Sequence, residues 1–372
     1  MKILHFISSL KHGGAERLVV DLLPLLKKQG IEVCLVSMTE ELALASFLEK
    51  QGIRVLTLQH RGTIYRADRM LQSIIKLKMI LNRVKPDILH SHLYLPDLVA
   101  RFAAPSRYRL ITTLHNTDFW WIENHRLRSR LKTKLDSSLG KIRQVFYIAV
   151  SAAIKEVACK VLHIQENRIR MIYNGIDLQK FSPKGKTETD HSFVIIQVGR
   201  FDKQKGHLTS LKALQSVRSL YPNVKLLLVG EGPQRHFIEE VTKRMALTDA
   251  VEFLGVCDDV PLIMHQSTIC WMPSEWEGLG IACIEAMACG LPVVASSVGG
   301  LTEVVSDNTT GYLIPNGSFE QLAKKTIKIF ADSGLAAQMS LAGRRRVEQK
   351  FSLEDTAARY VEAYKDIIEG RW

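Results

Sequence analysis

The chain has 372 residues, of which 46% are hydrophobic and 24% are charged, and its net charge is +12. This composition excludes a disordered chain, the length favours two domains over one, and no apolar run approaches the roughly 18 residues that cross a bilayer. Between Arg54 and Arg143 there are 18 Lys and Arg against 6 Asp and Glu. Such a patch implies an anionic partner: a phosphate-bearing substrate, a membrane surface or nucleic acid.

The first half of the chain alternates apolar strands with amphipathic helices. It begins with a buried strand, which is favoured over a signal peptide because Lys11 and His12 end the apolar run. Strands are expected at 3–9, 31–36, 54–58, 86–92, 110–114, 145–150 and 169–173, and helices at 15–28, 43–51, 67–84 and 152–161, the last capped by Ser151. This alternation predicts a parallel sheet.

Glycine or histidine residues lie at or just after the ends of three of these strands. Gly13 and Gly14 open the first helix, where they either admit an anion close to the backbone or simply make a tight turn. His90 and His92 are either a metal pair or, as we favour because no third ligand is visible nearby, polar residues that line a loop. His115 lies where α/β proteins place ligands, although a structural histidine is an equal alternative.

An aromatic and basic segment follows His115. Phe119, Trp120 and Trp121 precede five Arg and Lys residues between positions 126 and 134. Aromatic rings next to cations suit the edge of an anionic membrane, where the rings lie at headgroup depth. The alternative is a solvated basic helix whose aromatic side chains belong to the core, and both interpretations stay open.

The second half repeats the alternation after a polar linker at 182–190. Strands are expected at 193–198, 224–229, 251–254 and 269–272, and helices at 207–221 and 234–245, with Asp258 and Asp259 as a helix cap. Two doubly wound α/β domains follow, over residues 1–181 and 192–352. The last helix, within 353–372, has no sheet of its own left to cover, and a return to the first domain is one option. The six cysteines form no Cys-x-x-Cys pair, so reduced thiols in a cytoplasmic protein are expected.

The stretch from Pro273 to Glu303 predicts a strand end, a glycine loop, a short helix, another strand and a second glycine loop that opens a helix. Glu277 and Glu285 lie eight positions apart across the junction of the first loop with the helix, and Gly299 and Gly300 are expected to offer bare backbone N–H groups. Carboxylates that accept hydrogen bonds from hydroxyls, beside a helix N-terminus that binds phosphate, indicate a nucleotide-sugar site.

Two further strand exits carry charged residues. Arg200 and Lys205 suit the neutralisation of a diphosphate, although surface solvation explains them better when they are taken alone. Gly230-Glu231-Gly232 resembles the start of a dinucleotide fingerprint, but Arg235 stands in place of its third glycine, so a dehydrogenase is not favoured.

In this order, the pieces resemble the retaining glycosyltransferases of family 4, and the match covers nearly the whole chain. It rests on an ordered set of motifs: Gly13-Gly14, His115, Asn174-Gly175-Ile176-Asp177, Gly199-Arg200, Lys205-Gly206, Gly230-Glu231-Gly232, Glu277 with Glu285, and Gly299-Gly300-Leu301. The resemblance implies an α/β protein of GT-B architecture, with two doubly wound parallel-sheet Rossmann-like domains facing each other across a cleft. It places the nucleotide mainly on the second domain and the acceptor mainly on the first.

The resemblance also implies residue roles. Arg200 and Lys205 would hold the donor diphosphate, Glu285 the ribose hydroxyls and Glu277 the transferred sugar, with His115 beside that sugar. The expected catalytic residues are His115, Arg200, Lys205 and Glu277. The expected donor-binding residues are Gly13, Gly14, Asn174, Gly199, Glu231, Val256, Gly278, Leu279, Gly280, Glu285, Gly299, Gly300 and Leu301. No metal site and no cofactor are expected, and the co-substrate is a UDP-sugar or a GDP-sugar.

The implied reaction transfers a sugar, with retention and a new alpha-glycosidic bond, to a lipid-linked or polysaccharide-type acceptor at the cytosolic face of the membrane. A phosphate oxygen of the donor takes the acceptor's proton. One alternative is a nucleotide-sugar epimerase or a small-molecule glycosyltransferase of the same fold. Another is a degenerate, non-catalytic protein that binds phosphate or nucleic acid. This last alternative is not favoured, because the motif glutamates, Arg200 and Lys205 are all intact, so no nucleic-acid partner is expected.

Overall fold

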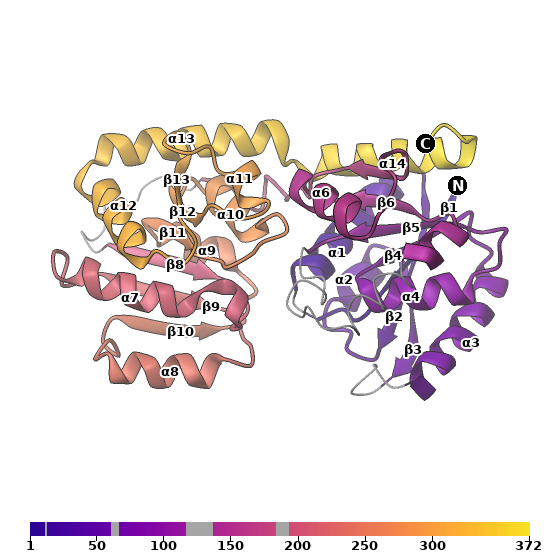
Figure 1. Ribbon diagram of the computed structural model, residues 1–372, viewed down its shortest axis with the longest axis horizontal. Helices are drawn as coiled ribbons and strands as arrows, with labels where there is room; N and C mark the ends of the chain where they lie inside the picture. The colour runs from indigo at the N-terminus through magenta and orange to yellow at the C-terminus, as the bar shows by residue number, and fades with distance from the viewer. Residues whose placement is uncertain (12, 61–66, 117–136, 184–192) are drawn as a thin grey trace. The chain divides into compact units, whose positions relative to one another are not determined.

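The computed structural model describes the chain except for residues 12, 61–66, 117–136 and 184–192 (Figure 1). The described residues form two compact units. Unit 1 comprises Met1–Gly175 together with Leu353–Trp372, and unit 2 comprises Ile176–Ser352. The aromatic and basic segment at 119–134 and most of the expected linker at 182–190 lie outside the described residues.

Unit 1 is built on a seven-stranded parallel sheet of order β3-β2-β1-β4-β5-β6-β7, which confirms the predicted parallel sheet. Its strands are β1 (Lys2–Ile7), β2 (Glu32–Thr39), β3 (Arg54–His60), β4 (Ile88–His92), β5 (Arg109–Leu114), β6 (Phe146–Ala149) and β7 (Ile169–Met171). Its helices are α1 (Gly14–Lys28), α2 (Ala45–Lys50), α3 (Ala67–Val84), α4 (Tyr94–Ala103), α6 (Ala152–Val161) and α14 (Leu353–Glu369), with the 3-10 turn η1 at Glu166–Arg168.

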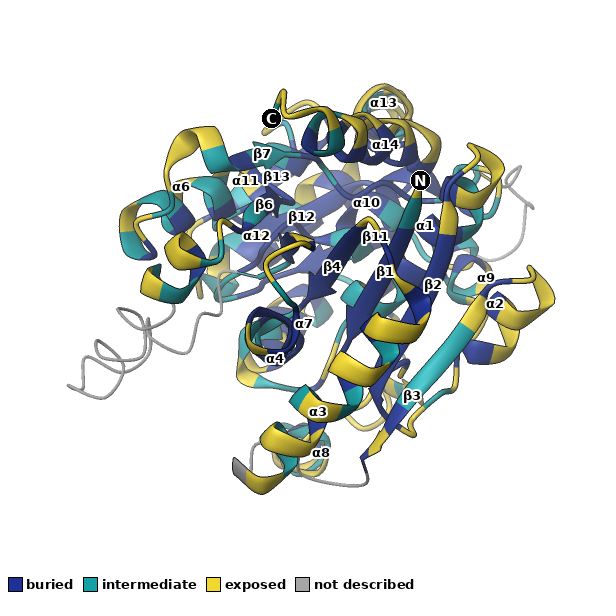
Figure 2. Cartoon of the chain, turned by 90° about the vertical axis from the view of Figure 1, so that its right-hand side faces the viewer, coloured by how far each residue is buried: buried dark blue, intermediate teal, exposed yellow. Residues whose placement is uncertain are grey.

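The strand order of unit 1 reverses at β1. Strands β2 and β3 lie on one side of β1, and β4 to β7 lie on the other. In open parallel sheets, ligands bind beyond the carboxyl ends of the strands at such a reversal. The ends of β1, β4 and β5 are therefore the part of unit 1 where a ligand site is expected. Strands β1, β2 and β4 are largely buried (Figure 2), as is usual for parallel strands covered on both faces.

The last helix, α14, packs against α1 within unit 1. Tyr360 and Val361 follow Ala357 by three and four positions, and Tyr364 follows them by four and three, so these residues line one side of α14. These side chains are buried in the same hydrophobic core as Leu22 of α1. Helix α14 thus brings two tyrosine hydroxyls into the interior of unit 1.

Unit 2 repeats the arrangement with a six-stranded parallel sheet of order β10-β9-β8-β11-β12-β13. Its strands are β8 (Val194–Val198), β9 (Lys225–Val229), β10 (Val251–Gly255), β11 (Ile269–Met272), β12 (Val293–Ser296) and β13 (Gly311–Ile314). Its helices are α7 (His207–Arg218), α8 (Arg235–Arg244), α9 (Val260–His265), α10 (Ile281–Ala288), α11 (Leu301–Val304), α12 (Phe319–Ala331) and α13 (Ser333–Lys350), with the 3-10 turn η2 at Lys203–Lys205. Here the order reverses between β8 and β11.

Local signals in the sequence agree with the structure at two helix starts. Ser151 Oγ accepts a hydrogen bond from the Ile154 N–H at 3.1 Å, and Asp259 Oδ1 accepts one from the Leu262 N–H at 3.2 Å. The helix expected after Gly300 is only the single turn α11, because the backbone becomes extended at Val305.

The six cysteines are free thiols, four of them buried, as expected. Across the described ranges, no helix is both long and apolar enough to cross a bilayer.

Candidate functional site

The candidate site of unit 2 lies where its sheet reverses, beyond the carboxyl ends of β8 and β11. Strand β8 is followed by Gly199, Arg200 and the turn η2, which ends in Lys205. Strand β11 is followed by a loop that contains Glu277 and ends at the start of α10. Because β8 and β11 are hydrogen-bonded neighbours, these two loops leave the sheet side by side.

Lys205 and Glu277 form an ion pair across the two loops. Lys205 Nζ lies 2.6 Å from Glu277 Oε2, and the two side chains are only 16% and 11% exposed. The buried Ser274 hydroxyl donates to the same carboxylate oxygen at 3.2 Å. The carboxylate is therefore fixed by two donors before any ligand binds, and the charge-assisted bond is the stronger of the two.

The side-chain amides of two glutamines hold the two loops in this position. Gln197 Nε2 donates to the Lys205 carbonyl at 2.7 Å, and Gln197 Oε1 accepts from the Ser210 hydroxyl at 2.6 Å. Gln204 Nε2 donates to the Trp276 carbonyl at 3.1 Å, which links one loop to the other. A site whose polar groups are locked in advance pays less reorganisation when a charged ligand arrives.

Close backbone approaches explain the glycines around the pair. Gly206 has a φ of +66°, and a Cβ there would lie 2.0 Å from the Pro273 carbonyl oxygen. Gly299 has a φ of +46°, and a Cβ there would lie 2.0 Å from the Glu277 carbonyl oxygen. The Gly300 N–H donates to that same carbonyl at 3.1 Å. The expectation of a bare N–H at Gly300 is therefore wrong, because the second glycine loop packs on the Glu277 loop and this donor is satisfied there.

Other expected donor-binding residues gather near the start of α10. They are the loop residues Gly278, Leu279 and Gly280, the partly buried Glu285 on α10, and Leu301 at the start of α11. The Leu279 and Leu301 side chains are buried, so they take part in packing the loops.

Three further expected residues lie at the exits of β8, β9 and β10. The Arg200 side chain is 69% exposed, and its ion-pair contact with Asp202 is long, at 3.8 Å. Val256, after β10, is 49% exposed. Glu231 forms an ion pair with Arg235. The arginine that stands in place of a third fingerprint glycine therefore neutralises Glu231.

The expected residues of unit 1 lie at the starts and ends of its elements. Gly13 is the N-cap of α1, and the Glu16 carboxylate lies where a Cβ on Gly13 would point, 2.3 Å from it. That carboxylate complements the helix N-terminus and would compete with an anionic ligand there, whereas Gly14 has open space around it. Asn174 is 4% exposed, and its Oδ1 is buried with no partner among the described residues.

His115 is the end of a cluster of histidines. The parallel pairing of β1 with β4 places His5 opposite His90, and His92 follows on the same face of the sheet. His5 Nδ1 is 3.0 Å from His92 Nε2, and His92 Nδ1 is 3.1 Å from His115 Nε2. One ring nitrogen from each of His5, His90 and His92 lies within 4.8 Å of the corresponding nitrogen of the other two.

Two expectations about His90 and His92 are therefore wrong. Both are fully buried, so neither lines a loop. A third histidine does lie nearby, because sheet pairing brings His5 to them across 87 residues of sequence. Even so, His90 Nδ1 lies 2.7 Å from Tyr364 Oη and its Nε2 lies 2.8 Å from Thr113 Oγ1. A metal ion would have to displace these hydrogen bonds.

Burial keeps the histidine cluster neutral. It lowers the pKa of His5 to about 3 and the pKa of His115 to about 4. The pKa values of His90 and His92 also lie well below the ordinary value, first because of burial and then because of repulsion from the neighbouring rings. Each ring therefore carries one proton near neutral pH.

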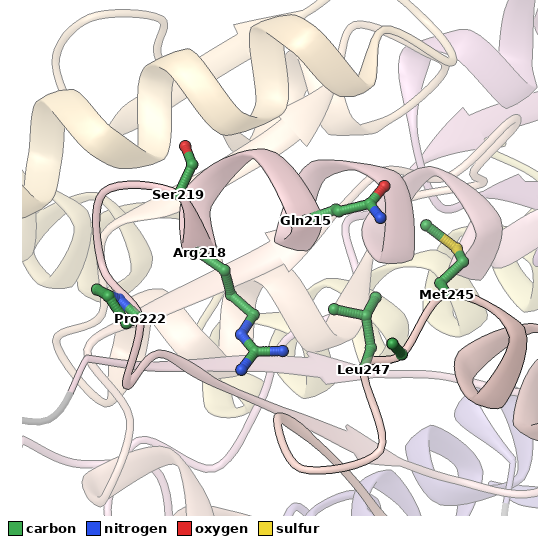
Figure 3. A pocket seen from close by; sticks show the side chains of 7 residues that line it. Gln215, Arg218, Ser219, Pro222, Met245 and Leu247 are labelled. Carbon is green, nitrogen blue, oxygen red and sulfur yellow. The ribbon is translucent and has the colours of Figure 1, made fainter.

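A separate depression of about 340 Å³ lies on unit 2 between the end of α7 and the residues after α8 (Figure 3). It is lined by Gln215, Arg218, Ser219, Pro222, Met245, Ala246 and Leu247. Arg218 is held by Asp249 through hydrogen bonds of 2.6 and 3.1 Å. None of the expected site residues lines this depression, so it does not belong to the candidate site.

No sequence motif pointed to Gln197, Ser274 or His5. Gln197 and His5 are polar residues inside otherwise apolar strands, and a buried polar side chain needs a hydrogen-bond partner. The sequence therefore indicates that Gln197 and His5 need hydrogen-bond partners, but it does not indicate which residues those partners are. Ser274 lies three residues before Glu277 in a loop that the sequence had already singled out.

Two family profiles match the chain in succession: "Glycosyltransferase Family 4" over residues 12–180 and "Glycosyl transferases group 1" over residues 179–346. The chain is 28% identical over 309 residues to N-acetyl-alpha-D-glucosaminyl L-malate synthase of Bacillus anthracis, covering 79% of this chain and 78% of the relative. It is 26% identical over 312 residues to UDP-Gal:alpha-D-GlcNAc-diphosphoundecaprenol alpha-1,3-galactosyltransferase of Escherichia coli, covering 80% of each. Among solved structures, Anabaena HepE in complex with UDP and glucose matches with a TM-score of 0.84 and 22% identity, covering 98% of this chain and 99% of HepE.

The two doubly wound parallel sheets and the match to HepE define a protein of the GT-B fold, as predicted. Together the two profiles run from residue 12 to residue 346. The chain is a glycosyltransferase and belongs to family 4, which confirms the family expected from its motifs.

Proposed function

We propose that this protein transfers a sugar from a nucleotide-sugar donor to a lipid-linked or polysaccharide-type acceptor, with retention and a new alpha-glycosidic bond. The observation that carries the proposal is the Lys205–Glu277 pair at the reversal of the unit 2 sheet. Its lysine supplies a fixed cation for a diphosphate, and its carboxylate can accept a hydrogen bond from a sugar hydroxyl. UDP occurs in the name of the Escherichia coli relative and in the HepE complex, so UDP-sugars are the first donors to test and GDP-sugars the second.

The chemistry explains why these residue types are needed. Breaking a glycosyl–phosphate bond leaves negative charge on the diphosphate and positive charge on the anomeric carbon. Lys205 and the exposed Arg200 stabilise the diphosphate, and a preorganised cation of this kind contributes several kcal/mol to the transition state. We assign Glu285 to the ribose hydroxyls of the donor and His115 to a position beside the transferred sugar.

Glu277 positions the sugar in this proposal and does not act as a nucleophile. Its carboxylate is already engaged by Lys205 and Ser274, which lowers its tendency to attack a carbon. A phosphate oxygen of the departing diphosphate accepts the proton of the acceptor hydroxyl. The proposed reaction therefore requires no protein base, and Lys205 and Arg200 take the place of a metal ion at the diphosphate.

We place the acceptor side of the reaction at the cytosolic face of an anionic membrane, with α3 as the contact. Leu71, Ile75 and Met79 of α3 lie at intervals of four residues and are 59%, 53% and 68% exposed. Figure 2 shows the exposed outer face of α3. Lys78 and Arg83 are exposed on the same helix. An apolar stripe flanked by cations suits insertion at the boundary between lipid headgroups and acyl chains.

The test of the function is transfer by purified enzyme from a panel of UDP- and GDP-sugars to a lipid-diphosphate-linked sugar. Lys205→Ala and Glu277→Ala should each abolish transfer while circular dichroism shows a folded chain. The matched controls are Lys203→Ala and Glu275→Ala, because these residues form an exposed pair at 3.6 Å in the same two loops. Full activity in either site variant would refute the site assignment. Conversion of the donor without acceptor would instead identify an epimerase.

A further inference from the structure

A continuous line of hydrogen-bonding groups runs through the interior of unit 1 from α14 to His115. Tyr364 Oη lies 2.7 Å from His90 Nδ1 and 3.5 Å from His5 Nε2. His5 then contacts His92 at 3.0 Å, and His92 contacts His115 at 3.1 Å. Four elements of unit 1 contribute to this line: β1, β4, the end of β5 and α14.

Neutral imidazole rings make such a line directional. A neutral ring donates from one nitrogen and accepts at the other, so the state of one ring decides the state of the next. His5 Nδ1 and Nε2 both have partners in this line, and so do both nitrogens of His92. The hydrogen bonds of the whole line can therefore run in either of two directions. One direction leaves His115 Nδ1 as a bare acceptor, and the other leaves it as an N–H donor.

Tyr364 selects the direction. Its oxygen lies 2.7 Å from His90 Nδ1 and 3.5 Å from His5 Nε2. Because a hydroxyl donor lies about 2.5–3.0 Å from its acceptor, the contact with His90 suits the hydroxyl proton and the contact with His5 does not. Since the hydroxyl has only one proton, which it gives to His90, its oxygen can only accept from His5 Nε2. His5 is then protonated at Nε2 and accepts at Nδ1 from His92 Nε2. His92 in turn accepts at Nδ1 from His115 Nε2.

His90 fits the same direction. When it accepts from Tyr364 at Nδ1, its proton is on Nε2, which then donates to Thr113 Oγ1 at 2.8 Å. Thr113 Oγ1 also lies 3.2 Å from Tyr360 Oη, so the second tyrosine of α14 is at the other end of the network. Among the hydrogen bonds of the described residues, the hydroxyl of Tyr364 is thus the only link between His90 and the His5–His92–His115 branch, although the His90 ring also stacks on His92.

We propose that Tyr364, His5 and His92 are positioning residues that hold His115 with Nε2 protonated and Nδ1 bare, as an acceptor for a hydroxyl group of the substrate. His115 Nδ1 is buried and has no hydrogen-bond partner within the described part of the chain. An unpaired buried acceptor costs free energy until a donor reaches it, and a sugar hydroxyl is a donor of the right size and charge.

This proposal rests on the proposed function only for the identity of that hydroxyl. It gives His115 one definite role, because a ring in this state accepts a hydrogen bond at Nδ1 and does not donate a proton to the departing phosphate. It also gives α14 a role, because the last helix of the chain sets the protonation of a ring at the end of β5.

The test is the nitrogen-15 spectrum of the histidine side chains in the ligand-free, full-length protein, because it reports which ring nitrogen carries the proton. The His115 signals are identified by their loss in His115→Gln. The expected result for the natural chain is a single form with Nε2 protonated and Nδ1 unprotonated. Tyr364→Phe removes one oxygen atom and should change His115 to a mixture of the two forms.

The matched control is Tyr360→Phe, which removes a buried hydroxyl from the same helix but from the other end of the network. Its His115 spectrum should match that of the natural chain. A His115 ring protonated at Nδ1 in the natural chain overturns the proposal, even if Tyr364→Phe fails to fold. An unchanged His115 spectrum in folded Tyr364→Phe overturns it as well. Neither result affects the transfer assay, which tests the proposed function separately.

Discussion

Lys205 Nζ lies 2.6 Å from Glu277 Oε2, although 72 positions separate the two residues and their loops follow different strands. Because both side chains are mostly shielded from solvent, removing either partner leaves a charge that is poorly solvated. A double-mutant cycle with Lys205→Met and Glu277→Gln should give a coupling energy of about 1–3 kcal/mol in urea unfolding. The same cycle on the exposed Lys203–Glu275 pair should give less than about 0.5 kcal/mol. Equal coupling energies in the two cycles would show that Lys205 and Glu277 interact no more strongly than the exposed Lys203–Glu275 pair.

The packing of the second glycine loop predicts a strong effect of Gly300→Ala. A Cβ at Gly300 would lie 2.3 Å from the Gly278 carbonyl oxygen, so the loop that carries Glu277 must move. We expect at least a tenfold fall in transfer and an unfolding free energy lower by about 1–3 kcal/mol, as for other overpacked sites. The control is Gly343→Ala in α13, where a Cβ would make ordinary contacts of 3.5 Å with Met287. That variant should be as stable as the natural chain or slightly more stable.

The buried histidines predict that acid destabilises the protein. Their folded pKa values lie below the unfolded value of about 6.5, so below that pH the unfolded chain binds more protons than the folded one. The stability contribution is therefore complete above about pH 6.5, and it is lost as the pH falls toward about 4 for His115 and about 3 for His5. Thermal unfolding between pH 7 and pH 4 measures this slope. His5→Asn should make stability depend less steeply on pH, whereas His163→Gln, at an exposed position, should leave the slope unchanged. An unchanged slope in His5→Asn would contradict the assignment of the acid effect to His5.

The exposed stripe of α3 predicts binding to anionic vesicles. A triple variant with Leu71→Ser, Ile75→Ser and Met79→Ser should sediment with such vesicles several-fold less than the natural chain, because it loses its apolar contact. Binding of the natural chain should also weaken as salt is added. Leu341→Ser is the control, since Leu341 is 54% exposed on α13 of unit 2. Equal binding of the natural chain to neutral vesicles would remove the electrostatic part of the proposal.

The cationic residues at the unit 2 reversal predict that transfer does not depend on a divalent metal. Lys205 and Arg200 supply the positive charge that a metal ion would otherwise provide to a diphosphate. The transfer rate should stay within about twofold when EDTA is added to enzyme and substrates. Loss of activity in EDTA, with recovery on addition of magnesium or manganese, would require a metal-binding group that this proposal does not include.

Local patterns predicted the secondary structure well where periodicity was strong. Helix α3 spans the 67–84 range expected from its amphipathic pattern, and the Ser151 and Asp259 caps are present. Helix α4 had no counterpart among the expected helices: it begins directly after Leu93, whose φ is +70°, and it contains Pro96 in its first turn. Proline is compatible with a first turn, but Leu93 has no side chain that could cap the helix, so the usual start signal is missing and packing against α3 and β4 accompanies the helix instead.

The sequence by itself determined the alternation of strands and helices, the parallel sheets and the family, because apolar runs, turn residues and ordered motifs are all local along the chain. Only the tertiary structure decided which distant side chains meet. His5 reaches His92 because β1 pairs with β4, and Lys205 reaches Glu277 because β8 lies beside β11. Strand order and register set these contacts through packing across the whole sheet, and no local pattern specifies them. For the same reason, the sequence could suggest His115 as a site residue but could not show the buried network behind it.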